Sequence, residues 1–332
     1  MASKYAAVHE NPQGPGDARP TALQILQDEN IGTKLHGKTI LITGCSSGIG
    51  ITTAQALHTT GATLYLTARN LTKAKTALGD LLSSPRVHLL ELDLESLASV
   101  RACAKEFLSQ SSQLNIFIAN AGVMATPEGR TKDGFETQFG TNHLSHFLLF
   151  NLLKDALLAS STPELNSRAI FLTSVGHRMG EPDLENLNLE GKYNPWAAYG
   201  SSKTANLWSA NEIERRYGSK GLHAWAVHPG GINSGLAQHI PEEEVAFMLQ
   251  NPVVVKLMKT PEQGAATTVW AAVAKELEGK GGKYLEECRV GAKANENAEM
   301  FESGFGAWAY DEVKEGKLWK KSLELVGLKD DL

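Results

Sequence analysis

An apolar segment that breaks into glycines constrains this chain more than any other stretch. Residues 38–50 read Lys-Thr-Ile-Leu-Ile-Thr-Gly-Cys-Ser-Ser-Gly-Ile-Gly, and a helical pattern continues to Thr60. The segment predicts a strand, a tight turn and a helix, because glycine permits the backbone angles and the close backbone approach that such a turn needs. The first N–H groups of that helix and the positive end of its dipole would face an anion such as a pyrophosphate. A plain structural turn is the alternative, since the G-x-x-x-G-x-G spacing differs from the commoner dinucleotide pattern.

Apolar runs of strand length alternate with amphipathic runs of helix length across most of the chain. The predicted strands lie at 39–43, 63–67, 87–92, 114–119, 168–173 and 222–227, and a last edge strand is expected at 282–286. The predicted helices end at 60 or span 71–82, 97–109, 135–158, 198–217 and 261–277, and smaller helices are expected at 21–30, 241–251, 253–259 and 310–325. Short strands joined by crossover helices form a parallel sheet with both faces covered. We therefore expect an α/β fold, namely a single doubly wound parallel-sheet Rossmann domain with helices on both faces and its ligand site at the carboxyl ends of the strands.

Composition divides the chain into parts. They are an N-terminal arm (1–35), a Rossmann domain (36–290) that includes a substrate lid (236–259), and a C-terminal extension (291–332). The arm is predicted to be partly flexible, because prolines and glycines between 12 and 20 stand among polar residues. The extension is expected to pack on the domain, because Trp308, Tyr310 and Trp319 supply enough aromatic surface.

Several short motifs follow one another in a recognisable order. They are Thr43–Gly50, Asn120-Ala121-Gly122, Asn142, Ser174, Tyr199–Lys203 and Pro229-Gly230. In order and spacing this set resembles the short-chain dehydrogenase/reductase family over about residues 36 to 280. The run 142–149, Asn-His-Leu-Ser-His-Phe-Leu-Leu, is most similar to the branch of retinol dehydrogenases and WW-domain oxidoreductases. The resemblance implies an enzyme that transfers hydride to or from a nicotinamide cofactor.

The resemblance places this dinucleotide along the strand ends. Its expected contacts are Gly44, Ser46, Ser47, Gly48, Ile49, Arg69, Asp93, Leu94, Asn120, Ala121, Gly122, Tyr199, Lys203, Pro229, Gly230, Ile232 and Ser234. After the second strand the chain has Ala68 and Arg69 where an acidic residue would repel a 2′-phosphate, so we expect NADP(H) as the cofactor. A solvated surface charge is the alternative for Arg69, and a helix cap is the alternative for Asp93.

The residues expected to carry the chemistry are Asn142, Ser174, Tyr199 and Lys203. Tyr199 and Lys203 are spaced i, i+4 and share one helix face, where the ammonium should favour ionisation of a phenol whose ordinary pKa is about 10. Ser174 ends the fifth strand and would polarise the reacting carbonyl oxygen, whereas its competitor Thr173 should point the other way. By resemblance, Lys203 also holds the ribose and Asn142 holds a water that relays protons. A surface amide is the alternative for Asn142.

These residues together predict an NADPH-dependent ketoreductase or alcohol dehydrogenase for a hydrophobic small molecule. The substrate expectation comes from the lid, in which Ile240, Val245, Phe247, Met248 and Leu249 stand among few charges. A non-catalytic NADP(H)-sensing or scaffold protein and an isomerase or dehydratase of the same fold are the alternatives. The phenol–lysine pair argues against a sensor, which needs no such pair.

Charge, cysteine content and hydropathy exclude other classes of protein. A formal net charge of −5 predicts no nucleic-acid partner, and three cysteines without C-x-x-C spacing indicate a reducing compartment. We expect no metal, because the histidines lack ligand spacing; those considered are His143, His146, His177 and His228. No apolar run has membrane-spanning length and no secretory leader is evident, so we expect a cytoplasmic protein. The two long helices that begin near Asn142 and Ala198 resemble a dimer interface of the family, so a homodimer is possible unless the C-terminal extension covers them.

Overall fold

The fold is built on one central sheet. The structure, a computed structural model, describes residues 4–299 and 301–331. The described strands form an eight-stranded sheet in the order β10-β9-β6-β5-β4-β1-β2-β3. They are β1 (Thr39–Ile42), β2 (Thr63–Ala68), β3 (Val87–Glu91), β4 (Ile116–Ala119), β5 (Ser167–Leu172), β6 (Leu222–His228), β9 (Lys283–Glu286) and β10 (Arg289–Val290). Neighbouring strands are parallel except for β9 and β10, and the strand order reverses between β1 and β4 as in a doubly wound sheet.

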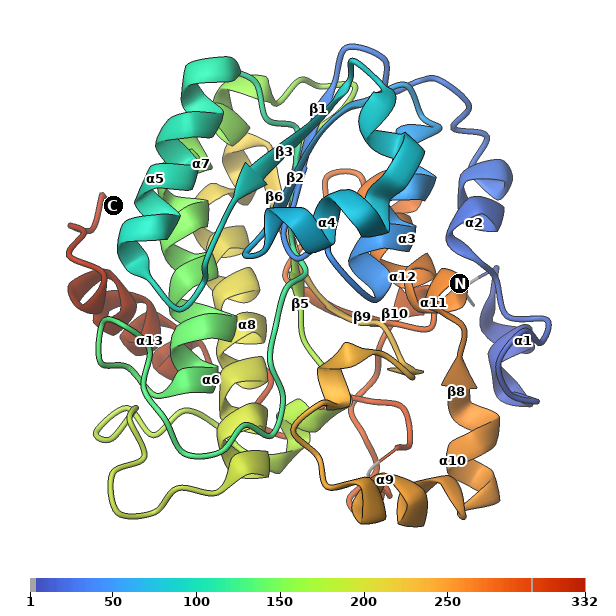
Figure 1. The fold of residues 1–332 in the computed structure, drawn as a ribbon, viewed down its shortest axis with the longest axis vertical. Coiled ribbons are helices and arrows are strands. Elements are labelled where there is room, and N and C mark those ends of the chain that lie inside the picture. Colours follow the sequence, from blue (N-terminus) through green and yellow to red (C-terminus); the bar gives the residue numbers. More distant parts are fainter. Residues whose placement is uncertain (1–3, 300, 332) are drawn as a thin grey trace.

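Helices cover both faces of this sheet (Figure 1). One face carries α5 (Leu97–Gln110), α7 (Ser145–Ser160) and α8 (Pro195–Tyr217), and the other carries α2 (Ala22–Asp28), α3 (Ile49–His58), α4 (Leu71–Leu78) and α12 (Ala266–Val273). Successive strand residues alternate between the two cores, because Leu41 packs with α5, α7 and α8 whereas Ile40 and Ile42 pack on the opposite side. The predicted doubly wound α/β fold is confirmed.

The helix predicted at 135–158 contains one wider, π-helical turn, and Asn142 lies in it. A short α6 (Thr137–Phe139) leads into a π-helical turn (Gly140–Leu144), which continues as α7. In this turn the Ser145 N–H donates to the Gly140 carbonyl, five residues back. Helical backbone thus runs without a break from 137 to 160, close to the prediction, but hydrophobic periodicity does not resolve the one wide turn within it. Turns of this kind are frequent at functional sites.

Two predictions for the C-terminal third of the chain also need correction. The strand predicted at 282–286 is β9, but it is not the sheet edge, because β10 pairs with it in antiparallel register and sets Arg289 opposite Glu286. The helix predicted at 261–277 is divided. The short strands are the pair β7 (Gly231–Ile232) and β8 (Met258–Lys259), and the short helices are α9 (Glu242–Leu249) and α10 (Pro252–Leu257) in the lid and α11 (Pro261–Gly264) before α12. Turns of 3-10 helix lie at Gly79–Ser83, Val175–Met179, Gly218–Lys220, Gly235–Ala237 and Lys275–Leu277.

The N-terminal segment is folded against the lid, although its composition predicts a flexible arm. Residues 4–19 include α1 (Ala6–Glu10), and the side chain of Arg19 is buried. Its guanidinium pairs with Asp17 at 2.8 Å and donates hydrogen bonds at 2.6–3.2 Å to several carbonyl groups, those of Gly14, Lys256, Leu257 and Met258. One side chain thus satisfies carbonyl groups at the end of α10. Composition could not indicate this, because the lid partners lie 237–239 residues further along the chain.

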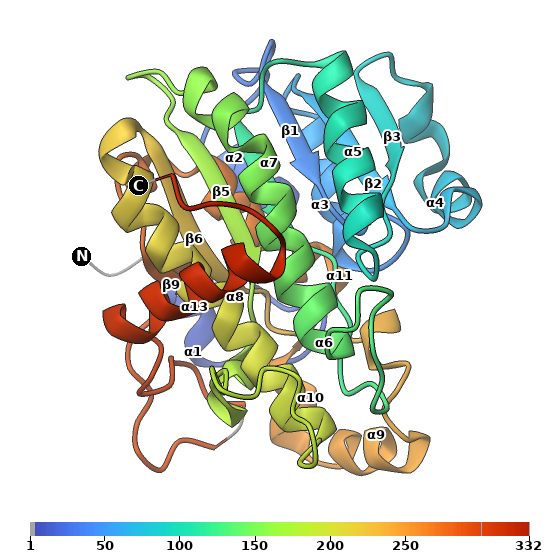
Figure 2. The same cartoon turned by 90° about the vertical axis from the view of Figure 1, so that its left-hand side faces the viewer.

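The last helix, α13 (Glu312–Leu325), lies across the outer side of α8 and reaches α7 (Figure 2). The buried ring of Trp319 meets Phe147 of α7 edge-on with centroids 4.8 Å apart, and the Arg216 guanidinium of α8 lies 4.8 Å from its centroid. Beyond α13, the Asp331 carboxylate pairs with Lys154 and accepts a hydrogen bond from the Tyr217 hydroxyl. The helix therefore covers part of the face that the family resemblance assigns to a dimer contact.

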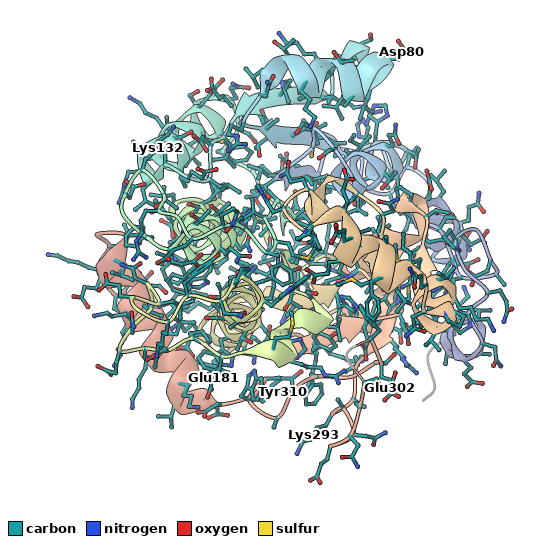
Figure 3. All side chains as sticks on the ribbon, turned by 60° about the horizontal axis from the view of Figure 1, so that its bottom comes forward. Asp80, Lys132, Glu181, Lys293, Glu302 and Tyr310 are labelled. Atoms are coloured by element: carbon teal, nitrogen blue, oxygen red, sulfur yellow. The ribbon has the colours of Figure 1, made fainter. Side chains whose placement is uncertain are left out.

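The chain between β10 and α13 runs along one end of the molecule, where Figure 3 labels Lys293, Glu302 and Tyr310. The Tyr310 hydroxyl oxygen accepts a hydrogen bond from the backbone N–H of Tyr284 in β9 at 2.8 Å. The backbone N–H of Gly306 donates to Nε2 of His177 at 2.9 Å. This segment thus braces both β9 and the turn that follows β5.

Candidate active site

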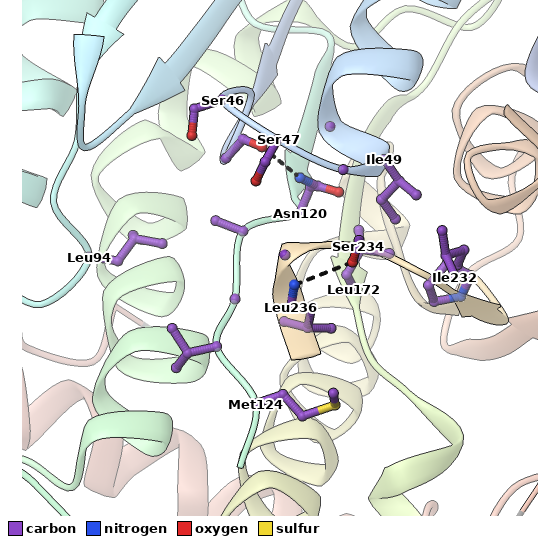
Figure 4. Close-up of a pocket in the computed structure, with 18 of the residues that line it drawn as sticks. Ser46, Ser47, Ile49, Leu94, Asn120, Met124, Leu172, Ile232, Ser234 and Leu236 are labelled. Carbon is purple, nitrogen blue, oxygen red and sulfur yellow. Dashed lines mark hydrogen bonds between the residues drawn. The ribbon is translucent and has the colours of Figure 1, made fainter. Parts of the chain in front are cut away.

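A pocket of about 400 Å³ opens at the carboxyl ends of the central strands. Figure 4 shows side chains from the glycine turn, from the segment after β4 and from the segment after β6 around it. Every residue predicted to contact the cofactor lines this pocket, and so do Ser174, Tyr199 and Lys203. Asn142 is not among the residues that line it. Lining residues that the motifs did not indicate include Thr67, Lys73, Val123, Met124, Leu236 and Gln238.

The glycine turn after β1 leaves no space for a side chain at positions 44 and 50. A Cβ on Gly44, whose φ is +74°, would stand 2.7 Å from the Cβ of Ala121, and one on Gly50 would stand 2.3 Å from the Gly44 carbonyl oxygen. α3 begins directly after Gly48, so the first backbone N–H groups of this helix lie at the turn. A narrow backbone cradle with free N–H groups fits a dinucleotide pyrophosphate.

The far end of the pocket is basic where a ribose phosphate would lie. Arg69 follows β2, is about two-thirds exposed and forms an ion pair with Glu95 at 2.6 Å. Lys73, in the first turn of α4, lines the same pocket. Arg69 is therefore neither free in solvent nor opposed by an acidic residue at position 68, which is occupied by the buried Ala68.

Asp93 lines the pocket beside this basic end. Burial alone would raise its pKa, but the hydrogen bond from Lys132 at 2.7 Å and the backbone N–H of Glu95 hold the pKa of the carboxyl below its usual value. The helix cap of α5 is Ser96, whose hydroxyl accepts from the Ser99 N–H. The alternative of a helix cap thus does not apply to Asp93, which stays ionised and faces the cavity.

Tyr199 and Lys203 lie on the buried face of α8, which begins after an Asn194 cap with Pro195 in its first turn. The Lys203 ammonium is 5.7 Å from the Tyr199 ring centroid and donates to the Leu172 carbonyl at 3.2 Å. Burial raises the pKa of Tyr199 to about 12, opposed by a hydrogen bond with the Ser174 side chain, and burial lowers the pKa of Lys203 to about 8.

These directions differ from the expectation that the ammonium brings the phenol below its ordinary pKa. Both groups lose hydration, and this cost exceeds the attraction between charges that are not in direct contact. Thr173 points away from Tyr199, as strand alternation predicts, since its hydroxyl donates to the Lys203 carbonyl at 2.8 Å. Ser174 is thus the hydroxyl that faces the phenol.

Asn142 is fully buried in the π-helical turn, which excludes the surface alternative. Its Oδ1 accepts the Val123 N–H at 2.8 Å, and its Nδ2 donates to the Val123 carbonyl and to Ser202 Oγ, each at 2.9 Å. A Cβ built on Gly122 would lie 3.1 Å from Asn142 Oδ1 and 3.3 Å from Lys203 Nζ. Asn142 therefore ties the segment after β4 to the helix of Tyr199 and Lys203, with Gly122 between them.

The histidines near the site do not form a ligand set. Among residues 4–299 and 301–331 there is no group of three His, Cys, Asp or Glu side chains that could hold a metal ion. His228 lines the pocket, and burial together with Lys259 lowers its pKa to about 3. His177 is held by Gly306, and His146 by Thr43 and Asn142.

Comparison with known proteins agrees with this arrangement. The family model described as short chain dehydrogenase matches residues 38–245. The short-chain dehydrogenase/reductase prx1 of Penicillium roqueforti is 49% identical over 327 residues, which are 98% of this chain and 96% of that protein. Retinol dehydrogenase 14 of Mus musculus is 37% identical over 307 residues, 89% of this chain and 87% of that protein. A crystal structure of an uncharacterized protein from Mycobacterium paratuberculosis has a TM-score of 0.67 at 32% identity and covers 90% of this chain and 96% of its own. The chain is thus a member of the short-chain dehydrogenase/reductase family of oxidoreductases, in its retinol dehydrogenase-like branch.

Proposed function

We propose that the protein is an NADPH-dependent oxidoreductase that interconverts a carbonyl and an alcohol on a hydrophobic small molecule. The observation that carries the proposal is the convergence of Ser174, Tyr199 and Lys203 on a pocket whose other end is a glycine turn at a helix N-terminus. A pocket that only sensed a dinucleotide would not need a buried phenol beside a buried ammonium.

The bound nicotinamide supplies the hydride, and the side chains manage the substrate oxygen. In the reducing direction the Ser174 hydroxyl donates to the carbonyl oxygen and holds it, and the Tyr199 phenol gives it a proton. A phenol whose pKa burial raises to about 12 is protonated at neutral pH, which suits a proton donor. Lys203 would hold the ribose hydroxyls of the cofactor, and Asn142 holds the segment after β4 that would lie beside them. In alcohol oxidation the proton moves back to Tyr199.

The preference for NADPH rests on the basic end of the pocket. Arg69 and Lys73 can both reach a 2′-phosphate, and no carboxylate at position 68 competes for a ribose hydroxyl. Glu95 holds Arg69 over this end, and a phosphate would share or replace that partner. An exposed ion pair of this kind is worth little, about 0–1 kcal/mol, so it does not block the phosphate.

The hydrophobic substrate is inferred from the nicotinamide end and the lid. Val123, Met124 and Leu236 line the pocket there. In α9 the side chain of Phe247 is 74% exposed and Leu249 is 47% exposed, so apolar surface is available beside the mouth. The name of the relative retinol dehydrogenase 14 indicates an apolar alcohol for that protein, which supports the same class here.

The remaining proposals concern location and assembly. The described part of the chain contains no helix that is long and apolar enough to cross a membrane. We propose a cytoplasmic protein in which residues 36–290 form the catalytic domain and 291–332 brace it. A homodimer would use a surface other than the part of α7 and α8 that α13 covers.

The test is the consumption of NADPH absorbance with a panel of apolar and polar ketones and aldehydes, with NADH in parallel. We expect turnover with apolar carbonyl compounds and a preference for NADPH. NADPH binding without turnover on any compound would favour the sensing alternative. Product formation without net NADPH consumption would favour the isomerase or dehydratase.

A further inference from the structure

His146, in the first turn of α7, is hydrogen-bonded through both ring nitrogens although it lines no part of the pocket. The residue is fully buried. Its Nδ1 lies 2.9 Å from the carbonyl oxygen of Asn142, and its Nε2 lies 2.8 Å from Oγ1 of Thr43. The imidazole thus bridges the π-helical turn that contains Asn142 and the residue that follows β1.

The direction of each hydrogen bond in this bridge follows from counting. Thr43 Oγ1 accepts the N–H of Ala121 at 3.0 Å and shares the N–H of Asn120, at 2.9 Å, with the Ile118 carbonyl, so of its three partners only Nε2 of His146 can accept a proton. Its single proton is therefore donated to Nε2 of His146. The ring must then carry its own proton on Nδ1 and donate it to the Asn142 carbonyl oxygen. Burial keeps the ring neutral, since it lowers the pKa of His146 to about 4 against the opposing carbonyl contact, and Lys203 acts in the same direction as burial.

The bridge connects two hydrogen-bonded segments that lie next to Lys203, whose ammonium itself donates to the Leu172 carbonyl. On one side, Thr43 holds the turn at 120–122 through its hydroxyl and through its carbonyl, which accepts Asn120 Nδ2 at 2.7 Å. On the other side, Asn142 holds Val123 and Ser202, the neighbour of Lys203. A change at His146 therefore shifts both segments relative to each other, although the ring touches neither the cavity nor the expected substrate.

We propose that His146 is a positioning residue for hydride transfer, which sets Asn142 relative to the turn at 120–122 through Thr43. The inference rests on the proposed function, because it concerns the same site. It predicts a single ring tautomer in the resting protein and a functional coupling between His146 and Thr43. A histidine that only filled the core would have the same tautomer, but its coupling to Thr43 would not extend to kcat/KM or to NADPH affinity.

The tautomer can be read in the unmodified protein. Two-bond proton–nitrogen correlation spectra of ¹⁵N-labelled protein distinguish a protonated Nδ1 from a protonated Nε2, and His146→Gln assigns the signal by its disappearance. We expect a neutral ring with the proton on Nδ1 at pH 7. A ring protonated on Nε2, on both nitrogens, or exchanging between tautomers would overturn the proposal, because the hydrogen bonds then could not run as described.

The coupling is tested with substitutions of graded severity. His146→Leu removes both hydrogen bonds; His146→Asn keeps a donor for the Asn142 carbonyl, and His146→Gln keeps an acceptor for Thr43. We expect His146→Leu to lower kcat/KM roughly ten- to hundredfold and to weaken NADPH binding by a smaller factor, with both conservative variants restoring part of the loss. His143→Asn is the matched control: it is a buried histidine three residues earlier whose Nε2 contacts Ser322 of α13, so it should lower the melting temperature without changing NADPH affinity.

A double-mutant cycle gives the decisive comparison. Thr43→Val combined with His146→Leu should lose less than the product of the two single losses, and Thr43→Ser, which keeps the hydroxyl, should behave like the wild type. Independent losses, or a folded His146→Leu with kcat/KM and NADPH affinity within about twofold of the wild type, would contradict the proposal. If His146→Leu does not fold, the comparison of Thr43→Val with Thr43→Ser and the tautomer of His146 still test the proposal. If no substrate is turned over, the NADPH dissociation constants and the spectra test His146 separately from the proposed function.

Discussion

Replacing Lys203 by methionine should make the protein more stable while it abolishes activity. Lys203 is 4% exposed, and burial lowers the pKa of its ammonium from 10.5 to about 8. That difference of about 2.5 units, at 1.36 kcal/mol per unit, corresponds to a cost on the order of 3 kcal/mol for holding the charge in the folded protein at neutral pH. Methionine fills a similar volume without the charge.

The substitution leaves no orphaned partner. The Leu172 carbonyl, which accepts from Lys203, also accepts from Nδ2 of Asn206 at 3.0 Å. The loss of one ordinary hydrogen bond offsets only about 1 kcal/mol, so a net gain of about 2 kcal/mol is expected at pH 7. With an unfolding entropy of about 2.1 cal/mol/K per residue, this gain raises the melting temperature by about 3 °C.

The pH dependence identifies the origin of the gain. Because the folded pKa is depressed, the unfolded chain binds the proton more tightly, and the stability of the wild type rises with pH between about 8 and 10.5. The advantage of Lys203→Met should thus be full below pH 8 and should vanish above 10.5. Calorimetry at pH 7 and near pH 10 measures it, and Lys105→Met, on the exposed side of α5, is the control that should change little. A wild type that is the more stable protein at pH 7, or a gap that does not depend on pH, would refute the reasoning.

Three further predictions address the cofactor, the proton donor and the C-terminal helix. Arg69→Ala should weaken NADPH roughly tenfold and leave NADH nearly unchanged in fluorescence titrations, because only NADPH offers a phosphate; equal losses would contradict the assignment. Tyr199→Phe should keep NADPH affinity and lower kcat by on the order of a hundredfold or more, and retained turnover would remove Tyr199 from the mechanism. Trp319→Ala should lower the free energy of unfolding by about 3–5 kcal/mol in denaturant titrations, because Trp319 is 2% exposed and packs between α7 and α8. The folded fraction of this variant should keep its NADPH affinity. An unchanged denaturation midpoint would show that α13 does not brace the two helices.

The sheet and the pocket could be predicted from the sequence because their signals are local. Apolar runs separated by amphipathic ones indicated every strand except β10 and the short pair β7 and β8, and each cofactor motif stands at the end of such a run. Glycines at 44 and 50 have no alternative in the folded turn, since a Cβ there would meet backbone or a neighbouring side chain. Residues whose conformation follows from their neighbours in sequence are the ones that pattern reasoning finds.

What could not be predicted depends on partners far away in the sequence. The pairing of Arg69 with Glu95, the exact place where the expected C-terminal cover meets α7 and α8, and the buried position of Arg19 all require the three-dimensional arrangement. The direction of the Tyr199 pKa shift was also out of reach. Sequence spacing places the ammonium on the correct helix face, but only the burial of both groups decides which effect is larger.

The contact of Arg19 with the end of α10 has a consequence for how the specificity of this protein can be changed. The guanidinium fastens the backbone at 256–258, which continues into β8 and pairs with β7 beside the nicotinamide end. The segment before α10 is held less firmly: α9 has no buried residue, although Ile240 before it is buried and Trp196 donates a hydrogen bond to Glu244 at 3.2 Å. The lid is thus fixed firmly at its C-terminal end, and residues 236–251 can be exchanged as one segment. Exchange of residues 236–251 should alter which substrates are accepted, whereas Ser174, Tyr199 and Lys203, to which hydride transfer is assigned, lie outside the exchanged segment.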